Sequence, residues 1–339
     1  MKPGVRNLIT DVPGIAVGNV HDTQVMSGVS VVLPNERCVA AVDARGGGPG
    51  TRETDALDPA NLVDEIDAIT LSGGSVFGLD AASGVTAWLA GEGRGFAVAA
   101  GGPPSPIVPA AILYDLNNDG DKDWGAVPPY RAMGIKAAGE AGLDFTLGNQ
   151  GAGYGAMAGT YKGGLGSASA VLQNGAIIGA LIAVNSFGAA VMPNTDRLWA
   201  APYALSGELG EATKAPEQGF DPTDLLTGTK AQAQAPGHNT TIGVVATDIA
   251  LTPAQAQRVA IMAQDGLARA LRPVHTPFDG DTIFVLSTAK RKLEDPAAFN
   301  LSLIGAAAAD VVARSVARGV YEAQTIGTMT SYRDRHGSN

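Results

Sequence analysis

Residues 239–248 read Asn-Thr-Thr-Ile-Gly-Val-Val-Ala-Thr-Asp, and the interpretation of the whole chain depends on this stretch. Its β-branched residues predict a strand over 240–247. The preceding residues, 206–238, contain Glu, Pro, Gly, Gln and Lys, a composition that predicts a mobile and exposed linker. The bond between Asn239 and Thr240 therefore joins a flexible segment to a buried strand.

Such a junction suits a peptide bond that the protein cuts itself. The Thr240 hydroxyl can attack the carbonyl of Asn239, and the resulting N→O acyl shift gives an ester that water hydrolyses. The freed α-amino group, with an ordinary pKa of ~7.7–8.0, can then act as base for the same hydroxyl. The alternative, from these residues alone, is a plain loop-to-strand boundary where Thr-Thr favours β structure.

Strands and helices mix through the rest of the chain without a repeat. Apolar and β-branched runs predict strands over 29–43, 67–70, 107–114, 176–185 and 282–287. Apolar residues at helical spacing predict helices over 77–89, 131–141, 253–270 and 301–321. We therefore expect one α/β sandwich, built from both sides of the linker as a single domain over 1–339.

Composition limits the class of protein. Of 339 residues, 45% are hydrophobic and 17% charged, which allows a large buried core. A net charge of −10 argues against a nucleic-acid partner, which would require a basic face. No membrane-spanning run and no apolar signal core are recognisable, so a cytoplasmic location is expected. Cys38 lies in an apolar run and is expected to be a buried core residue; it has no cysteine to pair with.

Two carboxylates flank a glycine in Asp279-Gly280-Asp281. Gly280 allows a sharp turn, so both side chains can converge near one point and titrate together. One carboxylate could hold the Thr240 ammonium or hydroxyl while the other orients the first. Without further context the same three residues would form a solvated turn.

Asn185 ends the apolar run 177–184. Its side-chain amide, with a nearby backbone N–H, could stabilise the oxyanion of a tetrahedral intermediate. The alternative is an asparagine that serves a turn at the end of a strand.

Three further patterns could suggest a cofactor or a metal site, but none fits one, so no cofactor and no metal are expected. The run Gly151-Ala-Gly-Tyr-Gly155 lacks the spacing of a dinucleotide loop. Residues 115–123 copy half of a calcium loop, but Ala126 stands where its bidentate glutamate belongs, so a surface loop is expected. The four histidines, none of them at zinc-ligand spacing, are His21, His238, His275 and His336.

Several long motifs carry a resemblance to a known family. They are Ile9-Thr-Asp-Val-Pro-Gly-Ile-Ala-Val-Gly18, Leu71-Ser-Gly-Gly-Ser-Val-Phe-Gly-Leu-Asp-Ala81, residues 239–248, and Arg272-Pro-Val-His-Thr-Pro-Phe-Asp-Gly-Asp-Thr282. In these the chain resembles the DmpA-type family of N-terminal-nucleophile hydrolases, which includes L-aminopeptidase/D-esterases, β-peptidyl aminopeptidases and 6-aminohexanoate-oligomer (nylon-oligomer) hydrolases. The resemblance implies an αββα sandwich, also found in ornithine acetyltransferases, cut into an α-chain (1–239) and a β-chain (240–339). It also implies a homo-oligomer, often a tetramer.

The resemblance extends to individual site residues. Many members carry Gly-Ser at the cut, whereas Asn239-Thr240 is similar to the nylon-oligomer hydrolases, in which both aspartates of 279–281 fall on catalytic positions. Lys162 matches a position where a lysine lies near the nucleophile, and a cation there would lower the pKa of the amine. Tyr114 matches an active-site tyrosine. We therefore expect Thr240, Asp279, Asp281, Asn185, Lys162 and Tyr114 to form the catalytic site.

The expected function is a self-processing threonine amidase that acts on small peptides or 6-aminohexanoate oligomers through an acyl-enzyme, without a cofactor. The alternatives are an aminopeptidase or D-amino-acid amidase-esterase, or a β-peptidyl aminopeptidase. An acetyltransferase of the ornithine type is disfavoured because its cut lies in an Ala-Thr-Met-Leu context, and this chain has Asn-Thr-Thr-Ile. An uncut binding or scaffold protein is the non-enzymatic alternative.

Overall fold

The computed structural model describes residues 1–97, 101–213, 221, 223–232 and 239–337. The helices are α1 (Asp80–Gly91), α2 (Tyr130–Gly139), α3 (Pro253–Ala270), α4 (Ala297–Tyr321) and α5 (Tyr332–His336). The strands are β1 (Ile15–Asp22), β2 (Ser27–Pro34), β3 (Cys38–Ala44), β4 (Thr51–Arg52), β5 (Glu65–Ile66), β6 (Ile69–Ser72), β7 (Ala110–Ile112), β8 (Met157–Ala158), β9 (Tyr161–Lys162), β10 (Gly164–Val171), β11 (Ile177–Asn185), β12 (Thr240–Ile249) and β13 (Thr282–Arg291).

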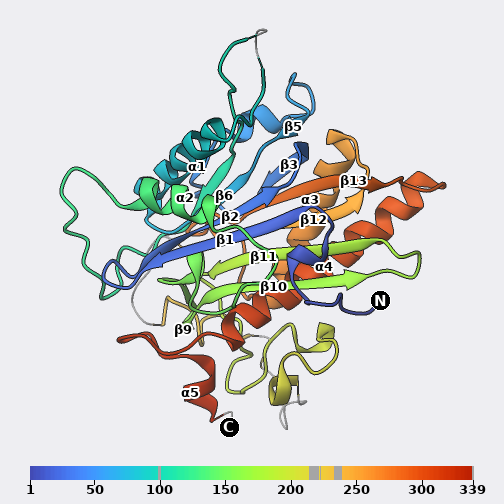
Figure 1. Cartoon of the computed structure of the whole chain (residues 1–339). Coiled ribbons are helices and arrows are strands. Elements are labelled where there is room, and N and C mark those ends of the chain that lie inside the picture. The colour runs from blue at the N-terminus through green and yellow to red at the C-terminus, as the bar shows by residue number, and fades with distance from the viewer. Residues whose placement is uncertain (98–100, 214–220, 222, 233–238, 338–339) are drawn as a thin grey trace.

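These elements stack in four layers, helices outside and two sheets inside (Figure 1). One sheet has the strand order β1-β2-β6-β7-β4 and is covered by α1 and α2. The other has the order β10-β11-β12-β13-β3-β5 and is covered by α3 and α4. The expected αββα sandwich is therefore confirmed.

Three apolar clusters fill the spaces between the four layers. One holds Val31 with Val85, between the first sheet and its helices. A second lies between the sheets and joins Leu71 to Val244. The third includes Val245 and lies between the second sheet and its helices. Neighbouring residues of β12 thus face opposite cores, as the two-residue period of a strand requires.

β12 runs through the middle of the second sheet, and all ten of its residues are buried. It pairs antiparallel with β11 and parallel with β13. A strand covered on both faces explains the nearly continuous apolar run that follows Thr240. β11 therefore holds β12 from Thr240 onward, and β13 holds it from Ile242 onward.

Most of the predicted elements are present, with shifted ends. The runs 176–185, 240–247 and 282–287 are β11, β12 and β13, and the predicted pair over 29–43 is β2 and β3. The run 107–114 yields only the three residues of β7. Thr252 caps α3 as expected, because its side chain accepts from the Gln255 N–H. Cys38 is buried, which raises its pKa to about 12.

The predicted linker, 206–238, is not uniformly exposed. Leu209, Ala212 and Thr229 are buried, so the prediction of exposure is wrong for them. Leu209 and Ala212 contribute to the core beneath α4, because the chain turns back onto this helix. Residues 214–220, 222 and 233–238, including His238, lie outside the described residues.

α4 is long and apolar, with a mean hydropathy of 1.3 over its most apolar window, and by length and composition alone could cross a membrane. In the fold it packs against α3, β10 and β11. Its Arg314 is fully buried and pairs with Glu208 at 2.6 Å between Nε and Oε1. Half of that apolar window is buried inside the protein, which is how a core helix packs.

Candidate active site

The bond between Asn239 and Thr240 lies at the first residue of β12. The Thr240 hydroxyl donates a hydrogen bond to the carbonyl oxygen of Asn239. Thr240 is 4% exposed and Asn239 1%. The hydroxyl and the adjacent carbonyl therefore lie in contact inside the protein, away from bulk water.

The turn before β13 holds the same carbonyl from the other side. The N–H of Gly280 donates to the Asn239 carbonyl oxygen at 2.9 Å, and the Asn239 N–H donates to Phe278 at 2.9 Å. A Cβ on Gly280 would lie 2.7 Å from both the Thr240 hydroxyl oxygen and the Gly48 carbonyl oxygen. Only glycine fits, because the turn lies directly against the hydroxyl.

Asp281 is buried behind the start of β12. Its Oδ1 accepts from the Thr241 N–H at 2.8 Å. Its Oδ2 accepts from the backbone N–H of His275 at 3.1 Å and lies 2.8 Å from the ring Nδ1 of His275. Asp281 thus fixes the residue after the predicted nucleophile, and His275 fixes Asp281.

His275 was not expected at the site, since the spacing of the histidines bears only on zinc binding. It has a positive φ of 54°. This left-handed conformation turns both its backbone N–H and its ring onto one carboxylate. Its place within the motif 272–282 is the one sequence signal that could have drawn attention to it.

Asp279 is buried beside Asp281 at the same turn. Its Oδ1 accepts from the Phe187 N–H at 3.0 Å, and its Oδ2 accepts from the Thr276 hydroxyl at 2.5 Å. Burial raises the pKa of Asp279, and the neighbouring Asp281 raises it further. The two carboxylates converge as the sequence predicted, each held by its own donors.

Asn185 is the strand partner of Thr240 in the pairing of β11 with β12. Its Nδ2 donates to the carbonyl oxygen of Tyr114 at 2.9 Å. Its Oδ1 accepts from the Met157 N–H at 3.0 Å. The strand register therefore brings the predicted amide to the predicted nucleophile.

Two of the predicted site residues, Lys162 and Tyr114, were taken from the resemblance, and their surroundings differ from those of the other four. Lys162 is fully buried, and its ammonium donates to the carbonyl oxygens of Gly153, Ala156 and Gly163 at 2.7–3.1 Å. Burial lowers its pKa to about 7. Among the described contacts of Lys162, none is to Thr240 or to the carboxylates, so its role there stays a prediction. The Tyr114 hydroxyl donates to Asn117 at 2.8 Å.

A second lysine, which falls within the predicted linker 206–238, lies at the site. Lys230 Nζ is 3.1 Å from Asn185 Oδ1 and 3.4 Å from the Asn185 carbonyl oxygen. Burial lowers its pKa to about 7, and the negative charge of Asp279 opposes that shift. Because the residues around Lys230 have the composition of a linker, the sequence did not indicate that Lys230 lies at the site.

A cavity of about 160 Å³ opens beside these residues. Its lining includes Tyr114, Asn185, Lys230 and Asn239, together with Asp115. Asp115 is buried, which raises its pKa to about 6, so the expected surface loop over 115–123 is wrong at its first residue. Asn239 thus lines a cavity together with two of the six predicted catalytic residues, Asn185 and Tyr114.

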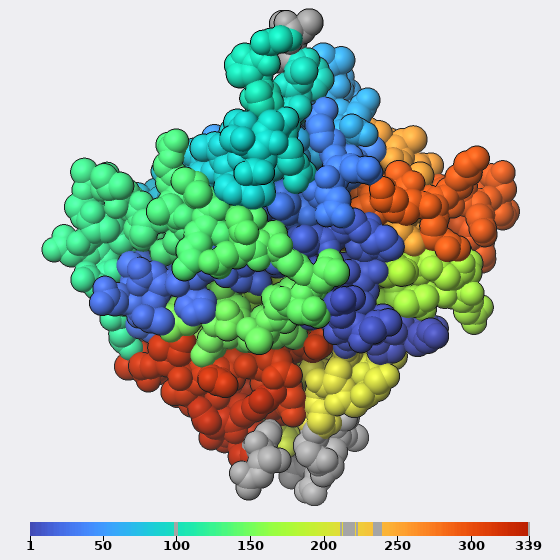
Figure 2. All heavy atoms as spheres, viewed as in Figure 1, coloured from blue at the N-terminus to red at the C-terminus, as the bar shows by residue number. Residues whose placement is uncertain are grey.

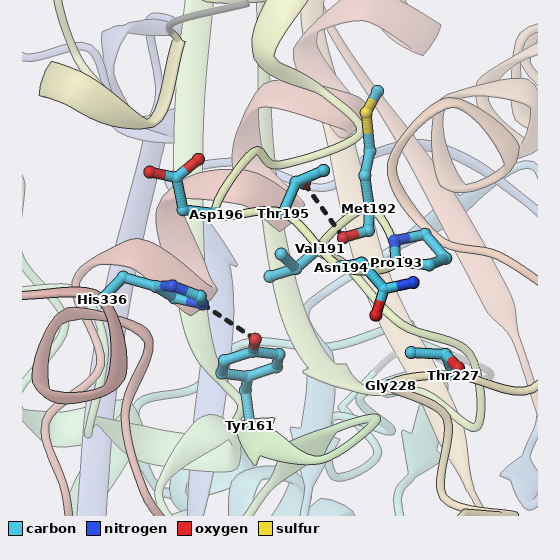
Figure 3. Close-up of a pocket in the computed structure, with 10 residues that line it drawn as sticks. All are labelled: Tyr161, Val191, Met192, Pro193, Asn194, Thr195, Asp196, Thr227, Gly228 and His336. Atoms are coloured by element: carbon cyan, nitrogen blue, oxygen red, sulfur yellow. Dashed lines mark hydrogen bonds between the residues drawn. The ribbon is translucent and has the colours of Figure 1, made fainter. Parts of the chain in front are cut away.

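A larger cavity of about 650 Å³ lies elsewhere, between Tyr161, Asn194, Thr227 and His336 (Figure 3). The Tyr161 hydroxyl lies 2.9 Å from His336 Nε2 there. None of the six predicted catalytic residues lines it. Within the described ranges, no group of three His, Cys, Asp or Glu residues could hold a metal ion.

The chain is similar to a known protein family and to several named proteins. The model of peptidase family S58 matches residues 7–333. An uncharacterized aminopeptidase of Mycobacterium tuberculosis is 45% identical over 351 residues, which cover 97% of each chain. A 6-aminohexanoate-oligomer endohydrolase of Paenarthrobacter ureafaciens is 30% identical over 290 residues, covering 82% of this chain and 74% of that protein.

Solved structures show the same fold. The L-aminopeptidase D-Ala-esterase/amidase of Ochrobactrum anthropi, described as a new variant of the Ntn hydrolase fold, superposes with a TM-score of 0.71. It is 21% identical, and the match covers 99% of this chain and 95% of that one. A beta-aminopeptidase of Burkholderia sp. gives a TM-score of 0.69 at 22% identity, over 97% and 90% of the two chains.

Proposed function

The chain belongs to peptidase family S58 and is a hydrolase of amide bonds with the N-terminal-nucleophile fold, and from that premise we propose that Thr240 is its nucleophile. We propose further that Thr240 becomes an N-terminus when the chain cuts itself after Asn239. One observation carries the proposal: the Asn239 carbonyl contacts the Thr240 hydroxyl and accepts the Gly280 N–H at 2.9 Å.

The cut begins when the Thr240 hydroxyl oxygen attacks the carbonyl carbon of Asn239. Negative charge develops on the carbonyl oxygen, and the Gly280 N–H already donates to that atom, as an oxyanion donor must. The C–N bond breaks, the nitrogen takes the proton from the hydroxyl, and an ester links Asn239 to Thr240. Water hydrolyses the ester, leaving a carboxylate on Asn239 and a free amine on Thr240.

Turnover of a substrate repeats the same chemistry between molecules. The free amine of Thr240 takes the hydroxyl proton, and the hydroxyl oxygen attacks the substrate amide. The substrate amine leaves with a proton, and water then hydrolyses the acyl-enzyme. Asp281 positions the start of β12 through the Thr241 N–H, while Asp279 and Asn185 lie beside the nucleophile.

We propose short peptides or linear 6-aminohexanoate oligomers as substrates. Asn-Thr at the junction and the Asp279–Asp281 pair support the second class by resemblance. Aminopeptidase activity is the second candidate, because the 45% identical relative is named an aminopeptidase. Incubation with alanine p-nitroanilide, a D-alanine amide, a β-peptide and a 6-aminohexanoate oligomer, followed by measurement of released amine, separates these classes.

Intact-mass spectrometry tests the cut. We expect fragments of residues 1–239 and 240–339, whose masses sum to that of the chain plus one water. Purified protein that stays a single chain of 339 residues after long incubation contradicts the proposal. A homo-oligomer and a cytoplasmic location are proposed on the resemblance and the composition, with size-exclusion chromatography and cell fractionation as their tests.

A further inference from the structure

The segment around Lys230 is fastened to the body of the protein. The Lys230 N–H donates to the Phe187 carbonyl oxygen at 3.0 Å, just beyond the end of β11. Two residues earlier, the Gly228 carbonyl oxygen accepts from the Thr160 N–H at 3.0 Å. Thr229 is buried, and its hydroxyl donates to Leu226 at 2.7 Å. The backbone of Lys230 is thus held independently of its side chain.

The ammonium of Lys230 reaches from this segment to Asn185. Its distances to the two oxygens of Asn185 are 3.1 Å for Oδ1 and 3.4 Å for the carbonyl. Both residues line the cavity that Asn239 also lines. The negative charge of Asp279 also acts on Lys230.

This contact decides which way the Asn185 amide points. The ammonium of Lys230 donates to Asn185 Oδ1 and cannot accept a hydrogen bond. The Met157 N–H donates to the same Oδ1 and cannot accept one either. A flipped amide would place its NH₂ group against both donors, so the Met157 N–H would lose this acceptor and Lys230 would keep the longer contact of 3.4 Å to the Asn185 carbonyl oxygen. The observed orientation leaves Nδ2 on the opposite side, where one of its two N–H groups donates to Tyr114. Among the described residues Nδ2 makes this one hydrogen bond, so we assign its second N–H to the oxyanion.

We propose that Lys230 is a positioning residue of the hydrolase, which fixes the amide of Asn185, the strand partner of Thr240, and interacts electrostatically with Asp279. It acts through Asn185 and not by contact with the reacting atoms. The inference rests on the proposed function, in which Thr240 is the nucleophile. It also assigns a role in the site to a residue of the segment that precedes the cut.

The test compares Lys230→Met with Lys230→Arg in the full chain. Met keeps the length of the side chain and removes the charge and the donors. We expect self-cleavage and the kcat for alanine p-nitroanilide to fall by about 10²-fold, the usual effect of losing one oxyanion donor, with KM changed less than about threefold. Lys230→Arg, which still donates to Oδ1, should restore part of the kcat.

Thr229→Val is the matched control, because it removes the hydroxyl bond within the same segment and leaves Lys230 in place. We expect its kcat to stay within about twofold of the unmodified protein, since no donor to Asn185 is lost. Equal losses in Thr229→Val and Lys230→Met would show that docking of the segment matters and would overturn the proposal. An unchanged kcat in Lys230→Met would also overturn it.

Thr240→Ala keeps the two proposals distinguishable. If Thr240→Ala is inactive while Lys230→Met has normal kcat, the assignment of Thr240 as the nucleophile is supported and the proposed role of Lys230 is refuted. If Thr240→Ala retains turnover, the proposed function itself is wrong. If Lys230→Met raises KM and leaves kcat unchanged, Lys230 acts in substrate binding. That result would also contradict a positioning role.

Discussion

The chain has opposite character on the two sides of the Asn239–Thr240 bond. After the bond, β12 is a ten-residue strand, buried throughout and paired on both edges. Before it, residues 206–213 and 223–232 are turns and the short helix η6 (Gly210–Thr213), anchored at a few points. Figure 2 shows this earlier segment (yellow) adjoining the C-terminal residues (red) at the lower end of the molecule.

The two regions therefore have different tasks: β12 positions the proposed nucleophile, and the segment before the bond attaches to the rest of the protein. A nucleophile needs a fixed position, which a central strand provides, whereas the acyl side of the bond must be able to leave. Substitution of the reacting Thr240 hydroxyl, or of the Gly280 turn against it, should therefore slow or stop the reaction without unfolding the protein. Substitutions within 206–213 and 223–232 should affect stability without stopping the reaction, and Lys230 is the proposed exception among these residues.

The largest effect is expected from Thr240→Ala. It removes the attacking hydroxyl and keeps the strand, so we expect neither self-cleavage nor turnover, with little change in Tm. Intact-mass spectrometry and an amidase assay on the folded protein measure both losses. Thr240→Ser, which retains a hydroxyl, should keep part of each activity. Near-normal turnover in Thr240→Ala would place the nucleophile elsewhere, with Thr241 the nearest hydroxyl.

A smaller but still large effect is expected from Gly280→Ala. The new Cβ would lie 2.7 Å from the Thr240 hydroxyl oxygen and from a backbone oxygen, so the turn or the hydroxyl must move. A displacement of about 1 Å at reacting atoms costs about 10²-fold in rate. Gly91→Ala is the control, because nothing lies within 4 Å of a Cβ there. Equal self-cleavage rates in the two variants would contradict the geometry of the turn.

A third prediction concerns His275→Asn. Asparagine tolerates the positive φ, so the backbone donor to Asp281 remains while the ring is lost. A hydrogen bond to a charged group contributes about 1.5–3 kcal/mol, so we expect kcat to fall by about 10- to 100-fold. Steady-state kinetics at several pH values measure this loss. A kcat equal to that of the unmodified protein would remove the ring from the site.

The smallest effect on the reaction is expected from Leu209→Ala, before the bond. Leu209 is fully buried, and such a truncation lowers the free energy of unfolding by about 2–5 kcal/mol. Turnover at low temperature should stay normal. Leu226→Ala, at a residue that is 59% exposed, should change stability by less than about 0.5 kcal/mol. Urea titrations of both, made in the Thr240→Ala protein, compare the two anchoring points.

The sequence could predict the parts of the site that lie in continuous motifs. Asn239-Thr240 and Asp279-Gly-Asp281 each bring their groups together within a few residues, and a strand and a turn suffice to place them. Asn185 was found because it ends a conspicuous apolar run, which is β11. These predictions depend on local structure only.

The missed residues depend on distant contacts. Lys230 lies in a polar, turn-rich stretch, and only folding places it against Asn185, 45 residues earlier. His275 reaches Asp281 through a backbone conformation that composition does not reveal. β10, whose residues are mostly small, was not predicted, because glycine, serine and alanine carry little strand signal. Its burial follows from α4 packing closely on it.

The central position of β12 has a consequence for maturation in the cell. On the proposed reaction, the bond is aligned only after β11 and β13 have closed on the strand, although β13 begins more than 40 residues later in the chain. Nascent or misfolded chains would stay intact, and only native molecules would be cut. The ratio of cut to uncut chains would then record how many copies have completed folding, and activity would appear only in those copies. Such coupling would protect other peptides from a half-folded amidase.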